Sequence, residues 1–408
     1  MSQSIAISEQ SASPGTESRG AMRSLRACLQ WSVIGSAVYA GCQWAILVVL
    51  AKLSSPESVG QFALGLAVTA PIMLFANLQL SGLQATDAKR EFRFGHYLAL
   101  RLVTTLLAVL VIAGVAFVSY PLMTALVVFT VGVAKAFEAI SDAYHGLMQQ
   151  HHRMERVARS QILKGTLSVI AVSAWLWFGG NILGAALALA AVWGLLMLAY
   201  DVRSTSLLRS DDQSATDPSF APAFAWPKLG QLAWLALPLG TCAILVALSF
   251  NVPRYVVEQY LGVDQLGIFA ALAYVSVVGQ VLSNALGQAA APRLAIYYAE
   301  GDMNAFRTLV FKLAGVGAVI GMGGVVLAWL AGRPLLMLLY RAEYAEQVNV
   351  FLGIMVGAAL WCVATMFYYA ATAARRQRSQ AVAAALVVLT ALTASLILVP
   401  RAGMIGAS

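Results

Sequence analysis

Residues 98–119 read LALRLVTTLLAVLVIAGVAFVS, and this segment has the pattern that decides the fold. Arg101 is its single charged residue, and about 20 apolar residues suffice to cross the hydrocarbon core of a bilayer as a helix. Eleven such segments are predicted, at 29–51, 59–83, 98–119, 122–147, 161–179, 182–200, 231–253, 265–291, 309–331, 350–373 and 381–399. They lack the two-residue alternation of barrel strands, so they predict an all-α polytopic membrane protein.

The overall composition excludes an ordinary soluble domain. Hydrophobic residues make up 60% of the chain and charged residues only 11%, against about 25% charged in a typical globular domain. Lys and Arg are concentrated in every second connection, with 18 of the 26 on one side of the predicted membrane. The positive-inside rule therefore places the N-terminus in the cytoplasm. The same rule explains the basic net charge without a nucleic-acid partner.

The chain repeats itself with an offset of 207 residues. The stretch VGQFA at 59–63 resembles LGIFA at 266–270, and the offset places Asn77 on Asn284. Both copies begin on the same side, so we expect two parallel six-helix repeats around a central cavity with a site at their interface. The predicted division is a disordered N-terminus at 1–28, a first lobe at 29–200, a linker at 201–230 and a second lobe at 231–408.

The second repeat ends early. ILGA at 182–185 opens the sixth predicted span, and the similar MIGA at 404–407 is followed only by Ser408. We therefore expect the twelfth helix to be truncated.

Charged side chains inside the predicted spans are the first candidates for a site. Lys135, Glu138 and Asp142 share one helical face, and Arg101 lies in the preceding span. They predict either a protonatable, ion-coupling carboxylate beside cations for an anionic substrate, or simple internal charge pairing. Lys164 lies near a helix end, from which it can snorkel to the interface.

Amides and prolines add weaker signals. Gln280, Asn284 and Gln288 are spaced four residues apart, and Asn77 lies at the position equivalent to Asn284. Amide side chains are unfavourable against lipid, so these residues predict either a cavity wall that binds substrate or ordinary interhelical hydrogen bonds.

Two prolines and one arginine complete the candidates. Pro71 and Pro238 interrupt their spans and predict kinks that act as hinges or stay static. Arg254 ends the seventh span, either as an anchor or as a cation at the mouth of the cavity.

Signals of catalysis are lacking in the sequence. The four cysteines have no metal-ligand spacing, no glycine-rich phosphate loop follows a strand, and the outer loops are too short for a catalytic domain. We therefore expect no enzyme activity, cofactor or metal, and energy from an ion gradient or the membrane potential.

Several segments together resemble bacterial polysaccharide-export flippases of the multidrug/oligosaccharidyl-lipid/polysaccharide superfamily. They are AKLSSPE at 51–57, Arg254-Tyr255, LGIFAALAY at 266–274, NALGQ at 284–288 and Pro292-Arg293-Leu294. The resemblance spans roughly residues 25–408.

The resemblance implies a flippase of the bacterial inner membrane. Its cargo would be an undecaprenyl-diphosphate-linked glycan, moved to the outer leaflet by alternating access, often with ion antiport. Arg101, Lys135 and Arg254 would supply cations for the diphosphate. A polysaccharide polymerase and chain-length machinery would be partners. The alternatives are a cation-coupled multidrug exporter of the same fold, a membrane glycan polymerase or ligase, and a non-transporting remnant.

Overall fold

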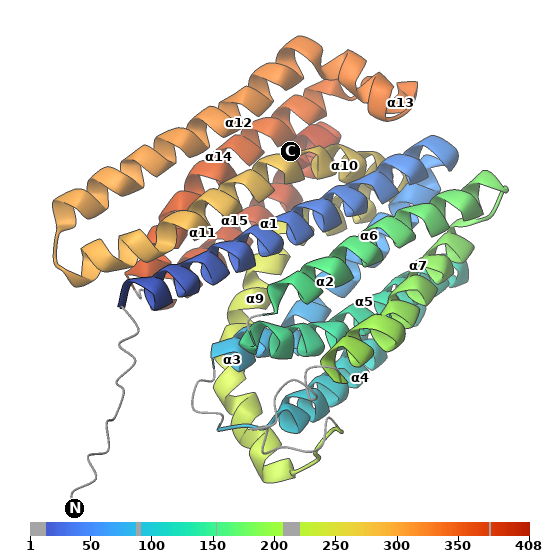
Figure 1. Cartoon of the computed structure of the whole chain (residues 1–408). Helices are drawn as coiled ribbons and strands as arrows, with labels where there is room; N and C mark the ends of the chain where they lie inside the picture. The colour runs from blue at the N-terminus through green and yellow to red at the C-terminus, as the bar shows by residue number, and fades with distance from the viewer. Residues whose placement is uncertain (1–13, 87–90, 152, 207–220, 375–376) are drawn as a thin grey trace, which may run out of the picture.

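The computed structural model describes residues 14–86, 91–151, 153–206, 221–374 and 377–408. Within these ranges the regular secondary structure is entirely helical (Figure 1). Ten of the described helices are long and apolar enough to cross a membrane. The predicted all-α polytopic membrane fold is confirmed.

The helices follow one another in two series. The first series is α1 (Pro14–Leu53), α2 (Pro56–Asn77), α3 (Leu80–Thr86), α4 (Phe94–Ser119), α5 (Leu122–Gln150), α6 (Met154–Trp177), α7 (Ile182–Leu196) and the π-helix η1 (Met197–Val202). The second series is α9 (Trp226–Leu261), α10 (Val263–Val275), α11 (Val277–Ala299), α12 (Met303–Leu339), α13 (Ala342–Ala345), α14 (Val348–Ala373), α15 (Gln377–Ala402) and the 3-10 helix η2 (Gly403–Ala407).

The two series make the same pairs of contacts. In the first, α1 packs on α6, α6 on α7, α2 on α5 and α4 on α5. The second repeats this with α9 on α15, α15 on η2, α11 on α14 and α12 on α14. Corresponding helices therefore pack on one another in the same way in both series, as expected for a duplicated fold.

Some boundaries differ from the sequence prediction. The predicted fifth span, 161–179, lies in α6, which is not among the ten apolar helices, because Gln161, Lys164 and several Ser and Thr residues lower the hydropathy of the part that follows its charged first turns. Helix α1 begins at Pro14, inside the segment 1–28 that the sequence predicts to be disordered. Once a helix is nucleated, further good helix formers extend it at little cost, and Ala21 to Arg26 contain several.

The linker predicted at 201–230 is also shorter than expected. Helix continues from η1 through residue 206, and α9 begins at Trp226. Residues 207–220 lie outside the described part of the chain. On the far side of this gap, the amide of Ala223 donates to the carbonyl of Gly95 over 2.9 Å, so the chain is already bound to α4 before α9 starts.

Helix α9 contacts both series. Its first turns bury Leu229, Leu232 and Ala236 against Leu78 and Tyr97 of the first series. Its later turns pack on α10, α15 and η2. The predicted start of a second lobe at residue 231 therefore falls inside a helix that joins the two series.

Two equivalent glycines allow a close backbone contact between the series. A methyl group added at Gly60 of α2 would lie 1.9 Å from the carbonyl oxygen of Val263, and one added at Gly267 of α10 would lie 2.2 Å from that of Pro56. Gly60 and Gly267 are related by the 207-residue offset. Only a residue without a Cβ lets the backbones approach this closely. We call this contact the glycine crossing.

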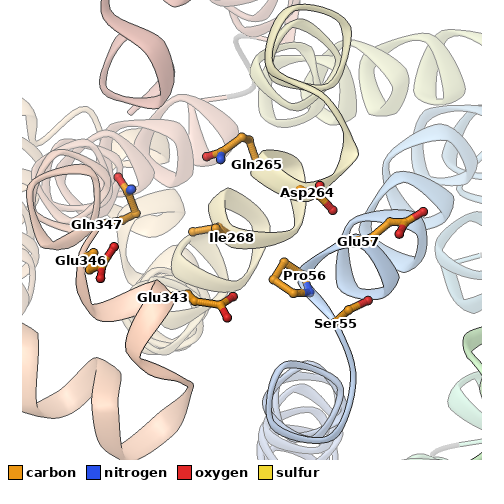
Figure 2. A pocket seen from close by; sticks show the side chains of 9 residues that line it. All are labelled: Ser55, Pro56, Glu57, Asp264, Gln265, Ile268, Glu343, Glu346 and Gln347. Carbon is orange, nitrogen blue, oxygen red and sulfur yellow. The ribbon is translucent and has the colours of Figure 1, made fainter.

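A pocket of about 390 Å³ lies beside the glycine crossing, at one end of both helices. Its lining includes Glu57 of α2 and Asp264 of α10, together with Glu343 and Glu346 from the second series, and Figure 2 shows these side chains around one space. Nearby, Nη2 of Arg341 donates to the carbonyl oxygen of Lys52 over 2.8 Å. This end of the molecule is therefore one of the places where the two series are joined by direct contacts.

The glycine crossing makes a testable prediction about stability. We expect Gly60→Val to destabilise the protein by about 1–3 kcal/mol, because the added carbons meet a backbone carbonyl that cannot rotate away. The measurement is the unfolding midpoint of the detergent-solubilised protein. Gly114→Val is the matched control, since nothing lies within 4 Å of a methyl group built there. Equal midpoints for the two variants would contradict the close packing.

Candidate functional site

Arg101 on α4 is fully buried and joins three helices. Its Nη2 lies 2.8 Å from Oδ2 of Asp142 on α5, and its Nη1 donates to the side-chain oxygen of Asn77 over 2.5 Å. The same nitrogen donates to the backbone carbonyl of Asn77 over 3.0 Å. Three residues that the sequence prediction named separately thus form one cluster, which we call the Arg101 cluster.

The backbone explains why Arg101 finds Asn77. Helix α2 ends at Asn77, where Leu78 and Gln79 take the left-handed conformation with φ of 49° and 52°. The end of a helix leaves carbonyl groups unpaired and carries partial negative charge, which a guanidinium satisfies well. Arg101 therefore caps a helix end inside the membrane.

Lys135 and Glu138 form a second cluster on α5. Nζ of Lys135 lies 2.7 Å from Oε2 of Glu138, and the hydroxyl of Tyr39 on α1 donates to the other carboxylate oxygen. Nζ of Lys135 also lies 4.9 Å from the ring centroid of Trp193, within range of a cation–π interaction. Both charged side chains remain partly exposed, at 25% and 32%. They are therefore reachable as well as paired.

Arg254 on α9 is the candidate cation of the second series. Its Nη1 donates to Oδ1 of Asn251 over 3.2 Å, and its guanidinium carbon lies 6.0 Å from the ring centroid of Tyr274 on α10. Among the described residues no carboxylate lies within ion-pair distance of it. Arg254 is thus held by an amide and a ring, and its positive charge is not neutralised.

The predicted amide stripe lies on α11 and is only partly engaged. Nε2 of Gln280 donates to the hydroxyl of Ser276 over 3.3 Å, and the Asn284 amide oxygen accepts from the hydroxyl of Tyr369 over 3.5 Å. Asn284 and Gln288 are exposed. The structure gives no contact between Asn284 and Asn77, whose amide oxygen is used by Arg101.

The prolines named as hinges lie within continuous helices. Pro71 is buried in α2, which continues to Asn77, and Pro238 is exposed in α9, which continues to Leu261. The break after α2 falls at Leu78 and Gln79. A hinge at either proline stays a prediction.

Sequence reasoning missed a further cluster, which is centred on Asp201 of η1. Its carboxylate accepts from Nζ of Lys164 over 2.8 Å and from the hydroxyl of Ser160 over 2.5 Å, and Nε2 of His145 lies 3.3 Å from it. Asp201 had been assigned to a loop because it follows an apolar run directly. Lys164 does not snorkel: it is buried with an exposed fraction of 2%, because Asp201 neutralises it.

The described residues contain no group of three or more His, Cys, Asp and Glu side chains that could hold a metal ion.

Comparison with solved structures defines the class of protein. The chain matches an inward-facing multidrug resistance MATE family transporter of the MOP superfamily with a TM-score of 0.75 and 13% identity, over 92% of both chains. An outward-facing MATE family transporter matches with a TM-score of 0.63 and 13% identity, over 94% of this chain and 90% of that one. A MOP superfamily transporter from Pyrococcus furiosus gives a TM-score of 0.63 and 12% identity, with the same coverage. At these identities the likeness shows the fold, which is that of multi-pass membrane transporters.

The sequence comparison then gives the family. Residues 28–297 match the family model described as polysaccharide biosynthesis protein, and this range is more than half of the 408 residues. The chain therefore belongs to that family. The capsular polysaccharide biosynthesis protein CapF of Staphylococcus aureus is 27% identical over 370 residues, which cover 90% of each chain. The predicted resemblance to polysaccharide flippases is confirmed, and family and fold together indicate a polysaccharide-related flippase or transporter.

The Arg101 cluster makes a second prediction. Removing one partner of a buried ion pair costs about 3–5 kcal/mol, so we expect Asp142→Asn to cost near the lower limit, because the Asp142 side chain is 39% exposed. The measurement is the unfolding midpoint in detergent.

The control for this prediction is Glu300→Gln, an exposed charge at the end of α11. We also expect the double variant Arg101→Met with Asp142→Leu to recover most of the loss, because it leaves no charge unpaired. A single Asp142→Asn variant as stable as the control would contradict the pairing.

Proposed function

We propose that this protein is a flippase that moves lipid-diphosphate-linked oligosaccharide from the cytoplasmic to the outer leaflet of a bacterial inner membrane. Alternating access of two lobes, divided near residues 200 and 231, would carry the movement. The support is the membership of the polysaccharide biosynthesis protein family together with a transporter fold. The cargo would be an undecaprenyl-diphosphate-linked glycan, with a polysaccharide polymerase and chain-length machinery as partners.

The observation that favours an anionic cargo is the unneutralised charge of Arg254. Arg101, Lys135 and Lys164 are each neutralised by a carboxylate, whereas Arg254 is not. A cation inside the membrane costs about 2.5–3.5 kcal/mol on insertion scales, so an unneutralised one is a site for an anion. A guanidinium binds phosphate oxygens with geometry that suits two hydrogen bonds at once.

The other predicted residues take supporting roles in this proposal. Lys135 is partly exposed and would add positive charge to the diphosphate site, while Arg101 would act mainly by fixing the end of α2. The amides of Gln280, Asn284 and Gln288 would bind sugar hydroxyls. Glu138 and Asp142 would serve ion coupling, since each is a carboxylate already paired with a cation. Pro71 and Pro238 would serve as hinges.

Arg254 gives the third prediction. We expect Arg254→Gln to lower the rate of glycolipid reorientation about tenfold or more, because a hydrogen bond to a charged group contributes about 1.5–3 kcal/mol. The measurement is the fraction of lipid-linked oligosaccharide that reaches the outer leaflet of vesicles, where an impermeant reagent modifies the sugar.

The matched control is Arg293→Gln, an exposed arginine that stacks on Tyr297 of its own helix. Unchanged reorientation in Arg254→Gln would remove Arg254 from the site. If reorientation were absent in the unmodified protein while cells expressing it expelled cationic dyes, the multidrug exporter would replace the flippase. That alternative is favoured by the multidrug transporters among the fold neighbours.

The proposed orientation gives the fourth prediction. Glu57 and Glu300 are exposed at opposite ends of the helices that carry them. In a cysteine-free background, we expect Glu57→Cys to react with an impermeant thiol reagent from outside the cell, and Glu300→Cys only after the membrane is opened. The opposite pattern would reverse the proposed topology, and labelling of both from outside would contradict an odd number of crossings between them.

A further inference from the structure

The cluster around Asp201 has the composition of a proton site. It draws its side chains from three helices: His145 from α5, Ser160 and Lys164 from α6, and Asp201 from η1. Every member is deeply buried, with exposed fractions of 8%, 1%, 2% and 0% in that order. Charges are almost never buried to this degree unless they are paired, and Lys164 and Asp201 neutralise each other here.

His145 is the member with an imidazole ring, which has a second nitrogen that can bind a proton. An unperturbed imidazole is the one side chain whose charge changes between about pH 5 and about pH 8. Its Nε2 faces two oxygens, at 3.3 Å from the Asp201 carboxylate and 3.1 Å from the Ser160 hydroxyl. Since the Ser160 hydroxyl donates to Asp201, Nε2 carries a hydrogen in this arrangement. The other nitrogen, Nδ1, is the position left for an additional proton.

The backbone around Asp201 is unusual. Residues 197–202 form a π-helix within the run that otherwise continues α7. A single π turn inside an α-helix is rare and is found frequently at functional sites. The Thr205 hydroxyl donates to the carbonyl of Asp201 over 2.8 Å, which fixes this turn at its far end. The insertion rotates Asp201 toward α5 and α6, away from the position that a regular helix would give it.

The cluster is connected to the candidate site at the centre of the first series. Lys164 is close enough to Glu138 for the two charges to interact electrostatically. A second connection runs through neutral groups, since Trp193 lies under Lys135 and its indole N–H donates to Ser168 over 2.9 Å. The Ser168 hydroxyl in turn donates to the carbonyl of Lys164. A change of charge at His145 is thus three interactions away from Glu138, through Asp201 and Lys164.

We propose that His145, Ser160, Lys164 and Asp201 form a proton-binding site that controls which carboxylate holds Lys164. One proton from water binds Nδ1 of His145, and no covalent bond other than this N–H bond is formed or broken. The imidazolium then shares Asp201 with Lys164, and the repulsion between the two cations shifts Lys164 toward Glu138. Loss of the proton returns Lys164 to Asp201.

The charges around the site support this direction of movement. On α5, Tyr144 interacts electrostatically with Asp201 and Glu138 with Lys164, and Asp142 is already bound by Arg101. On α6, Arg156 is engaged near the end of η1, where its Nη1 donates to the carbonyl of Ser204. Glu138 is therefore the carboxylate to which a displaced Lys164 can turn. The binding of the proton does not depend on the proposed transport, whereas its use in coupling rests on that proposed function.

The test is infrared difference spectroscopy of the purified full-length protein between about pH 8 and about pH 5, the range in which an imidazole changes charge. The Asp201 carboxylate band is the one that Asp201→Asn removes, and Asp201→Glu displaces the same band if the asparagine variant does not fold. We expect this band to shift with pH in the unmodified protein and to stop shifting in His145→Gln. His151→Gln is the matched control, because His151 lies on the same helix end outside the cluster, and its variant should keep the shift.

An Asp201 band that is constant over this pH range, or that shifts equally in His145→Gln, would overturn the proton site. Coupling is tested separately by the dependence of glycolipid reorientation on the pH of one compartment. We expect at least a fivefold flattening of that dependence in His145→Gln and none in His151→Gln. If the band shifts but the unmodified protein reorients no glycolipid, the proposed function fails and the proton site stands.

Discussion

Neutralising cations inside the bilayer is the constraint on which the first series of helices depends. Three cations of these helices each have a carboxylate of their own: Asp142 for Arg101, Glu138 for Lys135 and Asp201 for Lys164. Two of the three pairs join different helices, so they fix how α4, α5, α6 and η1 lie together as well as neutralising charge. Breaking a buried pair is far more costly than replacing it whole, which makes these contacts sensitive to single substitutions.

The second series lacks this internal balance at its best-placed cation. Arg254 is held by Asn251 and Tyr274 and keeps its charge available. The two series meet at the glycine crossing and through α9, which packs on both. In the proposed function, Arg254 would bind the diphosphate of a lipid-linked saccharide.

The sequence predicted the helical membrane fold and the repeat, because hydropathy and spacing depend on short segments. The pairing of Lys135 with Glu138 was among the predicted alternatives for the same reason. Contacts between helices that are distant in the sequence were harder to predict, because nothing in the residue spacing indicates that Arg101 reaches both Asn77 and Asp142. Asp201 was missed because the predicted sixth span ends at residue 200, directly before it. Only the fold reveals that a π turn brings it to Lys164.

The most direct test of the central claim is to measure binding of undecaprenyl diphosphate to the purified protein in detergent by native mass spectrometry. The account predicts that the protein binds the diphosphate lipid, that Arg254→Gln lowers the affinity at least about tenfold, and that Arg293→Gln leaves it unchanged. Equal binding by both variants, or no preference for the diphosphate over an uncharged prenol, would contradict an anion site at Arg254.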